Sequence, residues 1–167
     1  MRPLHFCQAC GARLDPAAVD GPAGCPSCGR HWYQNMAPTA GAAIVKDGKV
    51  LITKRAFHPE KGRYDIPGGF LHMREHPVDA LKREVKEELD IEIEATMDDI
   101  VQMVPHPYGD DGEWVLAIGF RARWVGGEPK PGDDVESFVW VGPDELDSYD
   151  FAWEHDRDLA RGALEHE

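Results

Sequence analysis

The segment at residues 69–91 reads GFLHMREHPVDALKREVKEELDI, and its second half has the pattern of an amphipathic helix. A proline near the first turn and an apolar residue at every third or fourth position predict a helix from Pro77 to Leu89. The repeating apolar positions are Val78, Leu81, Val85 and Leu89. We therefore expect this helix to bury one stripe against the rest of the chain.

Three glutamates lie on the flank of that stripe. At about 100° per residue, Glu84 and Glu88 fall along one line of the helix, and Glu87 lies beside them. They occupy the C-terminal half of the helix, where the helix dipole disfavours each anion by about 0.3–1 kcal/mol, and they also repel one another. One interpretation is a solvated acidic face. The other is a metal site, because hard carboxylate oxygens in this number suit Mg²⁺ or Mn²⁺.

Gly68 and Gly69 precede the helix at a predicted strand end, where the backbone can approach a ligand closely. From Gly69 to Ile91 the segment resembles the signature of the Nudix hydrolase family, G-x5-E-x7-R-E-U-x-E-E-x-G-U, in which U is aliphatic. Every specified position matches except that Asp90 stands where the family usually has glycine. That position follows the helix and favours left-handed backbone, which Asp tolerates at modest cost.

The resemblance implies roles for the matching residues. The groups that would hold Mg²⁺ or Mn²⁺ are Glu84, Glu87, Glu88 and the Gly68 carbonyl. Arg83 and Glu75 would form an ion pair that orients these glutamates. The reaction would be attack of water on a phosphorus of a diphosphate linked to a nucleoside, since a metal ion neutralises the diphosphate and lowers the pKa of bound water. The general base would be a glutamate of the signature or one of three later acids, and the sequence leaves this choice open. Those acids are Asp133, Asp134 and Glu136.

The four cysteines form two C-x-x-C pairs, Cys7 with Cys10 and Cys25 with Cys28. Two matched pairs allow four thiolates to converge on one zinc ion, and a closed shell of four cysteines is typical of a structural site. The alternatives are redox pairs or two unrelated pairs of free thiols. A nucleic-acid-reading ribbon has little support, because only three arginines lie in residues 1–35. We expect a zinc ribbon at residues 1–35, followed by a Nudix hydrolase domain at residues 36–167.

The rest of the chain predicts mostly strands. Asp47-Gly48 joins two apolar runs as a hairpin turn. Three further strands are predicted at residues 91–104, 114–125 and 138–141, with a helical turn at Pro143 and a closing helix at residues 152–164. This pattern indicates an α+β or layered domain. The resemblance implies the Nudix α/β/α sandwich with a mixed β-sheet.

Composition limits the partners. The net charge of −13 argues against affinity for nucleic-acid backbones, but it leaves room for a small anionic ligand bound through metal. The apolar run Ala40–Val45 is far shorter than the roughly 20 residues of a membrane span, and the first residues lack the apolar stretch of a signal peptide. We expect a soluble, cytoplasmic protein that binds a small nucleotide and no membrane, with a homodimer left open.

The loop after the signature bears on the substrate. NADH pyrophosphatases of the family carry S-Q-P-W-P-F-P-x-S there. Val101–Tyr108 keeps Gln102 and two prolines but has Val104 and His106 at the aromatic positions. The four-cysteine ribbon, its exit at Tyr33-Gln34-Asn35 and the short length resemble the ribbon-bearing ADP-ribose/FAD pyrophosphatases of the family. The resemblance therefore favours ADP-ribose or FAD over NADH. Two alternative hypotheses stay open. One is hydrolysis of oxidised nucleoside triphosphates, and the other is a non-catalytic sensor or binding module. Residues 153–156, Trp-Glu-His-Asp, are predicted to be a solvated helix start, and the single histidines to be surface residues.

Overall fold

The computed structural model describes residues 4–14, 21–110 and 113–165, and most of them belong to one eight-stranded sheet with a helix on each face. The sheet strands are β3 (Ala37–Lys46), β4 (Lys49–Arg55), β5 (Tyr64–Asp65), β6 (Gly68–Phe70), β7 (Glu92–Glu94), β8 (Ile100–Tyr108), β9 (Glu113–Gly126) and β10 (Val135–Val141). The helices are α1 (Pro77–Leu89) and α2 (Glu154–Glu165), with short 3₁₀ turns at Met97–Asp99 and Pro143–Ser148. The order of the main strands is β10-β4-β3-β9-β7, while β5, β6 and β8 pair with β4, β3 and β9.

The sheet is mixed because β3 and β9 run parallel, whereas the other pairs are antiparallel. The predicted hairpin is confirmed. Lys46 pairs with Lys49, and both Asp47 and Gly48 have positive φ, as the two-residue turn requires. The α+β class and the α/β/α layering are therefore confirmed.

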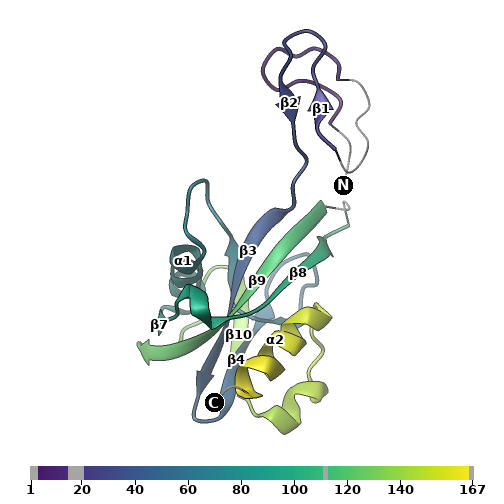
Figure 1. Ribbon diagram of the computed structural model, residues 1–167. Helices are drawn as coiled ribbons and strands as arrows, with labels where there is room; N and C mark the ends of the chain where they lie inside the picture. Colours follow the sequence, from purple (N-terminus) through teal and green to yellow (C-terminus); the bar gives the residue numbers. More distant parts are fainter. Residues whose placement is uncertain (1–3, 15–20, 111–112, 166–167) are drawn as a thin grey trace.

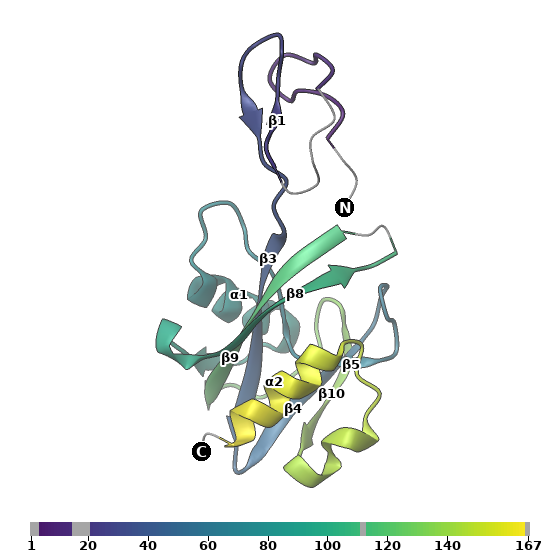
Figure 2. The ribbon, with the colours of Figure 1, turned by 45° about the vertical axis from the view of Figure 1, so that its right-hand side comes forward.

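Two apolar layers fill the spaces between the sheet and its two helices. Figures 1 and 2 show α1 and α2 on opposite faces of the sheet. The predicted stripe of α1 is buried against one face, where Ile44, Leu51 and Phe120 are fully covered. Alternate residues of β3 point to the other face, where Val45 packs with the α2 residue Leu159. Because successive side chains of the central strands point to opposite faces, both faces of the sheet are apolar, and each packs against one helix.

The strand predicted at residues 91–104 is wrong as one element. The chain forms β7, a 3₁₀ turn and then β8, and these two strands pair with different parts of β9. The turn is stabilised by Asp99, whose Oδ2 accepts hydrogen bonds from Thr96 N at 2.7 Å and Thr96 Oγ1 at 2.8 Å. In addition, β10 begins three residues earlier than predicted, and α2 begins at Glu154 instead of residue 152.

The N-terminal segment forms a small ribbon that lies beyond the N-terminal end of β3 (Figure 1). Its strands are β1 (Ala23–Gly24) and β2 (His31–Trp32), which pair antiparallel. Trp32 packs on the ribbon's own core of Cys7, Leu14, Ala23 and Cys25, whereas Tyr33 is exposed. No helix in the described residues combines the length and apolar composition needed to cross a membrane.

Candidate active site

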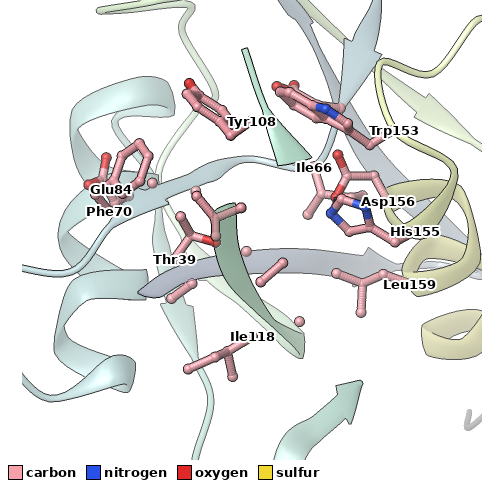
Figure 3. Close-up of a pocket in the computed structure, with 18 of the residues that line it drawn as sticks. Thr39, Ile66, Phe70, Glu84, Tyr108, Ile118, Trp153, His155, Asp156 and Leu159 are labelled. Atoms are coloured by element: carbon pink, nitrogen blue, oxygen red, sulfur yellow. Dashed lines mark ion pairs between the residues drawn. The ribbon is translucent and has the colours of Figure 1, made fainter. Parts of the chain in front are cut away.

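A cavity of about 260 Å³ opens between the sheet, α1 and the start of α2 (Figure 3). One end is formed by signature residues, with Gly68, Gly69, Glu84 and Glu88 in its lining. The other end is formed by Trp153, His155 and Asp156, which come from the start of α2 and the residue before it. The cavity therefore joins the predicted metal-binding residues to a segment that sequence reasoning placed in solvent.

Glu84 and Glu88 are the two signature glutamates that reach the cavity. Glu88 is buried and accepts a hydrogen bond from the backbone N–H of Gly68 at 3.0 Å. Burial, together with the nearby Asp134, Asp65 and Glu84 carboxylates, raises the pKa of Glu88 well above its ordinary value. Burial likewise raises the pKa of Glu84, against the effect of Arg83.

The two glycines of β6 make this arrangement sterically possible. A Cβ on Gly69 would lie 2.5 Å from the Cδ of Glu84, so only glycine leaves room for that carboxylate as placed. Gly68 has φ of 150°, and a Cβ there would lie 2.1 Å from the carbonyl oxygen of Ala40. The close contacts at these two glycines are therefore with Glu84 and the backbone of β3, and the predicted approach to a ligand stays a prediction.

Arg83 connects the parts of the signature. Its Nε and Nη2 donate to the two carboxylate oxygens of Glu75 at 2.8 and 2.9 Å, and its Nη1 donates to Glu84 at 2.7 Å. Further hydrogen bonds reach Glu87 at 3.1 Å and the carbonyl of Phe70 at 3.1 Å. The guanidinium, with the backbone N–H of His72, lowers the pKa of Glu75 to about 2. Arg83 therefore ties α1 to the end of β6 and to the intervening loop.

The residues predicted as metal ligands divide into two groups. Glu84, Glu88 and Gly68 line the cavity, while Glu87 is half-exposed and contacts Arg83. In the described residues, the only group of three or more His, Cys, Asp or Glu donors gathered within 4.8 Å of one another is that of the four cysteines. The chemistry at the cavity nevertheless fits Mg²⁺ or Mn²⁺, because buried Glu88 and partly buried Glu84 line it together and a divalent cation would offset their repulsion.

The three later acids are also separated by the fold. Asp133 and Asp134 line the cavity, in a loop held to α1 by the bond from Gly132 N to the Glu88 carbonyl. Glu136 instead forms an ion pair with Lys54 at 2.8 Å and is absent from the cavity lining. A base that acts inside the cavity is thus better placed at Asp133 or Asp134.

The solvated helix start predicted at residues 153–156 is wrong. The side chains of His155 and Asp156 are each only 13% exposed, and Trp153, His155 and Asp156 all line the cavity. His106 also lines the cavity, with its ring 4.1 Å from that of His155. Asp156 stands three and four residues before Leu159 and Ala160, so extending the apolar stripe of α2 backwards would have placed it on the buried face.

The four cysteine side chains converge in the ribbon. The Sγ atoms of Cys7 and Cys28 are 3.7 Å apart, and those of Cys10 and Cys25 are 3.6 Å apart. Tetrahedral zinc with Zn–S bonds of about 2.3 Å needs sulfur separations of about 3.8 Å, so the group fits that ion. Burial opposes ionisation of Cys7, but hydrogen bonds from the Ala9 backbone and the Trp32 indole help bring its pKa down to about 6.

Comparison with known proteins identifies the class. The NUDIX domain model matches residues 36–161, and the chain belongs to the Nudix family. The NAD-capped RNA hydrolase NudC of Pseudomonas aeruginosa is 31% identical over 145 residues, which cover 85% of this chain and 49% of that protein. An ADP-ribose pyrophosphatase of Methanocaldococcus jannaschii is 34% identical over 104 residues, which cover 62% of this chain and 60% of that protein. The chain spans about half the length of the NudC relatives.

Solved structures agree with this assignment. A Nudix hydrolase from Nitrosomonas europaea superposes with a TM-score of 0.72 at 25% identity, covering 98% of this chain and 92% of that one. A MutT Nudix hydrolase from Burkholderia pseudomallei has a TM-score of 0.64 at 31% identity, covering 79% of this chain and 98% of that one. The first of these similarities extends through the ribbon segment.

Proposed function

We propose that this chain is a metal-dependent hydrolase that cleaves the diphosphate bond of a nucleoside diphosphate linked to another group, with ADP-ribose or FAD as the preferred substrate. The main support is a pair of carboxylates, the buried Glu88 and the partly buried Glu84, that face one cavity beside Arg83. We also propose a structural zinc ribbon at residues 1–35 and the hydrolase domain at residues 36–167.

Each group of residues in the site has a separate role in the proposed reaction. Glu84 and Glu88 would hold Mg²⁺ or Mn²⁺, with Glu87 and the Gly68 carbonyl as the further ligands implied by the signature. The ion supplies charge neutralisation of the diphosphate and acidifies bound water. Arg83 and Glu75 fix the direction of the glutamates through the bidentate ion pair. Asp134 is the proposed general base outside the signature, because it lines the cavity close enough to Glu88 to raise its pKa.

Three observations bear on the choice of substrate. Similarity to NudC favours a nicotinamide dinucleotide or a capped RNA, as does the chain's 85% coverage in that match. The net charge of −13 disfavours an RNA partner, and Val104 and His106 replace aromatic residues of the NADH pyrophosphatase pattern. The proposal also includes a cytoplasmic location, since cytosolic reductants keep thiols like those of the four cysteines free.

The test is hydrolysis by the full chain with Mg²⁺ or Mn²⁺ of ADP-ribose, FAD, NADH, NAD-capped RNA and a nucleoside triphosphate. We expect the highest kcat/KM for ADP-ribose or FAD, with AMP released. Glu84→Gln and Glu88→Gln should each lower kcat by at least about 100-fold while the fold is retained. Glu92→Gln, at an exposed position of β7, is the matched control and should keep full activity. Turnover that survives EDTA, or full activity in Glu88→Gln, would refute the mechanism, and a preference for NADH or a triphosphate would refute the substrate.

A further inference from the structure

His72 lies in the loop between β6 and α1 and lines the cavity at the end formed by the signature. Its side chain is 70% exposed, and its ring forms no hydrogen bond within the described residues. We propose that this imidazole binds the diphosphate of the substrate, by donating a hydrogen bond from Nε2 to a phosphate oxygen. Such a role rests on the proposed function and adds a substrate-binding residue at a position that the signature leaves unspecified.

The signature end of the cavity is lined by carboxylates, which are those of Glu84, Glu88, Asp133 and Asp134. A metal ion held by Glu84 and Glu88 would neutralise part of the diphosphate charge. The phosphate oxygens that do not contact the ion lose water when they enter the cavity, so they need hydrogen-bond donors from the protein. Ionised carboxylates only accept hydrogen bonds and would repel these oxygens. A nitrogen donor is therefore required beside them.

Arg83 is the cation of the signature, but its N–H groups are all in use. A guanidinium group has five of them. In Arg83 two donate to Glu75, and the others donate to Glu84, Glu87 and the Phe70 carbonyl. Arg83 therefore orients the glutamates and leaves no donor for a phosphate.

The other nitrogen-bearing side chains of the lining are engaged or lie at the opposite end. Arg55 donates to Asp65 at 2.6 Å, and Gln102 donates to the His155 carbonyl at 2.7 Å. The side chains at the α2 end are His106, Trp153 and His155. In the described part of the chain, His72 is thus the side-chain nitrogen at the signature end that is open to a ligand.

The backbone around His72 is held in a tight turn. The His72 N–H donates to Glu75 Oε2 at 2.8 Å, and the Glu75 N–H donates to the His72 carbonyl at 3.1 Å. Arg74, inside this turn, has φ of 69°, a left-handed conformation that residues other than glycine rarely adopt. Such a conformation persists only where the surroundings fix it, and it is common at ligand-binding sites. A ligand that binds His72 therefore loses little free energy in ordering this turn.

The imidazole has one nitrogen near a carboxylate and one that remains for a ligand. Nδ1 of His72 lies 3.9 Å from Glu75 Oε2, beyond hydrogen-bond distance. A protonated imidazole carries a hydrogen on both nitrogens, so Nδ1 can face Glu75 while Nε2 donates to a phosphate oxygen. An anionic phosphate is a strong acceptor for such a donor. Because this hydrogen bond is made in the bound substrate as well as in the transition state, its loss should act mainly on KM.

The experiment compares His72→Leu with His72→Gln in the full chain, since the Gln amide keeps a nitrogen donor and Leu removes it. The probe is α,β-methylene-ADP with Mg²⁺, in which carbon replaces the bridging oxygen so that the diphosphate is not cleaved. By calorimetry, we expect its dissociation constant to rise about tenfold in His72→Leu and to stay within about threefold of wild type in His72→Gln. Met73→Leu, an exposed change in the same turn, is the matched control and should behave as wild type. Adenosine, which has no phosphate, should bind all four proteins equally.

Kinetics of the same proteins separate the role of His72 from the proposed function. KM for ADP-ribose should rise about tenfold in His72→Leu, with kcat within about threefold of wild type. If wild type hydrolyses ADP-ribose but His72→Leu keeps both KM and the affinity for the methylene analogue, the role of His72 is wrong and the function stands. If no diphosphate is hydrolysed but the analogue binds more weakly to His72→Leu, the role stands and the function fails.

Three other results would overturn donation from His72. They are a matching loss of adenosine affinity in His72→Leu, equal losses in the Gln and Leu variants, and a wild-type chain that does not bind the analogue. Thermal unfolding of each variant checks that the fold is retained, which is expected because the substituted side chain is exposed.

Discussion

Arg83 contacts four other residues of the signature region with one guanidinium group. The planar fork meets both oxygens of Glu75 while its other nitrogen reaches Glu84 and Glu87. A lysine ammonium is a compact charge and does not reproduce this fork, so the two cations are not interchangeable here.

Arg83→Lys should therefore lower kcat/KM by about 10- to 100-fold, because Glu84 and Glu75 lose their fixed orientation while the charge is kept. The reverse exchange at the exposed neighbouring position, Lys82→Arg, should leave activity unchanged. Steady-state kinetics together with thermal unfolding of both variants test this. Full activity in Arg83→Lys would show that the fork is dispensable.

His155 provides a pH-dependent term in stability. Burial and the neighbouring His106 lower its pKa from 6.5 to about 4. Because the folded-state pKa is lower, the unfolded chain takes up the proton first as the pH falls, so this contribution is complete above about pH 6.5 and is lost toward pH 4. Between pH 7 and pH 5 the loss should amount to about 2 kcal/mol.

Urea unfolding at pH 7 and pH 5 measures that loss. His155→Gln should show a pH-dependent fall in stability smaller than that of wild type by about 2 kcal/mol. His58→Gln, which removes an exposed histidine, should follow wild type. Parallel pH profiles for wild type and His155→Gln would contradict the buried, neutral state of this ring.

Residue types alone predicted one end of the cavity and missed the other. The signature fixes residue identity and spacing together, so Glu84, Glu88 and Arg83 were found without a structure. Asp156 and His155 belong to no such spacing, and polar residues at a helix start are usually solvated. The apolar stripe of α2, extended backwards, places Asp156 on the buried face, but the depth of burial of both side chains depends on how α2 docks on the sheet, which is a property of the tertiary fold.

The pair formed by α1 and β6 shows how two elements share one steric constraint. Gly69 of β6 contacts the Glu84 carboxylate of α1 so closely that an added Cβ would lie 2.5 Å from Glu84 Cδ. A methyl group at this position would displace the mobile end of a side chain instead of backbone atoms, so the effect should fall on the site more than on the fold.

Gly69→Ala should reduce activity by at least about tenfold and change the free energy of unfolding by less than about 1 kcal/mol. Gly126→Ala in β9 is the matched strand substitution, since its Cβ would lie 3.7 Å from the nearest atom, Glu92 Oε2. Kinetics and chemical denaturation of both variants decide the matter. Wild-type kinetics in Gly69→Ala would mean that Glu84 has free space elsewhere.

Local pattern predicted elements best where their stabilising contacts are local. The helix at residues 77–89 and the Asp47-Gly48 hairpin follow from apolar period and turn chemistry, and both are confirmed. The break between β7 and β8 follows from pairing with a strand that comes later in the chain. Asp90 has φ of 55°, so the signature position where the family has glycine is left-handed, as predicted.

For the whole molecule, the ribbon and the sheet have separate sources of stability. The sheet has two apolar layers, whereas the ribbon core consists of a few residues around two buried cysteines. So small a core needs a further stabilising link, and under the proposed zinc site a metal ion held by the four converging thiols would supply it.

Metal analysis of the full chain should give about one zinc per molecule, and Cys25→Ser should lower this value and raise hydrogen exchange in β1 and β2 while the sheet stays protected. Ser27→Ala, an exposed change between Cys25 and Cys28, should keep the metal and the protection. A chain that holds no zinc but keeps a protected ribbon would contradict this picture.

The parallel pairing of β3 with β9 also constrains the order of events on the ribosome. Ala37 pairs with Val115, so a long stretch of polypeptide must emerge before the centre of the sheet closes. The four thiols all lie between residues 7 and 28 and can be brought together long before that. During synthesis the ribbon should therefore fold first. The apolar faces of β3 and β4 should stay exposed to solvent until the second half of the chain has been made.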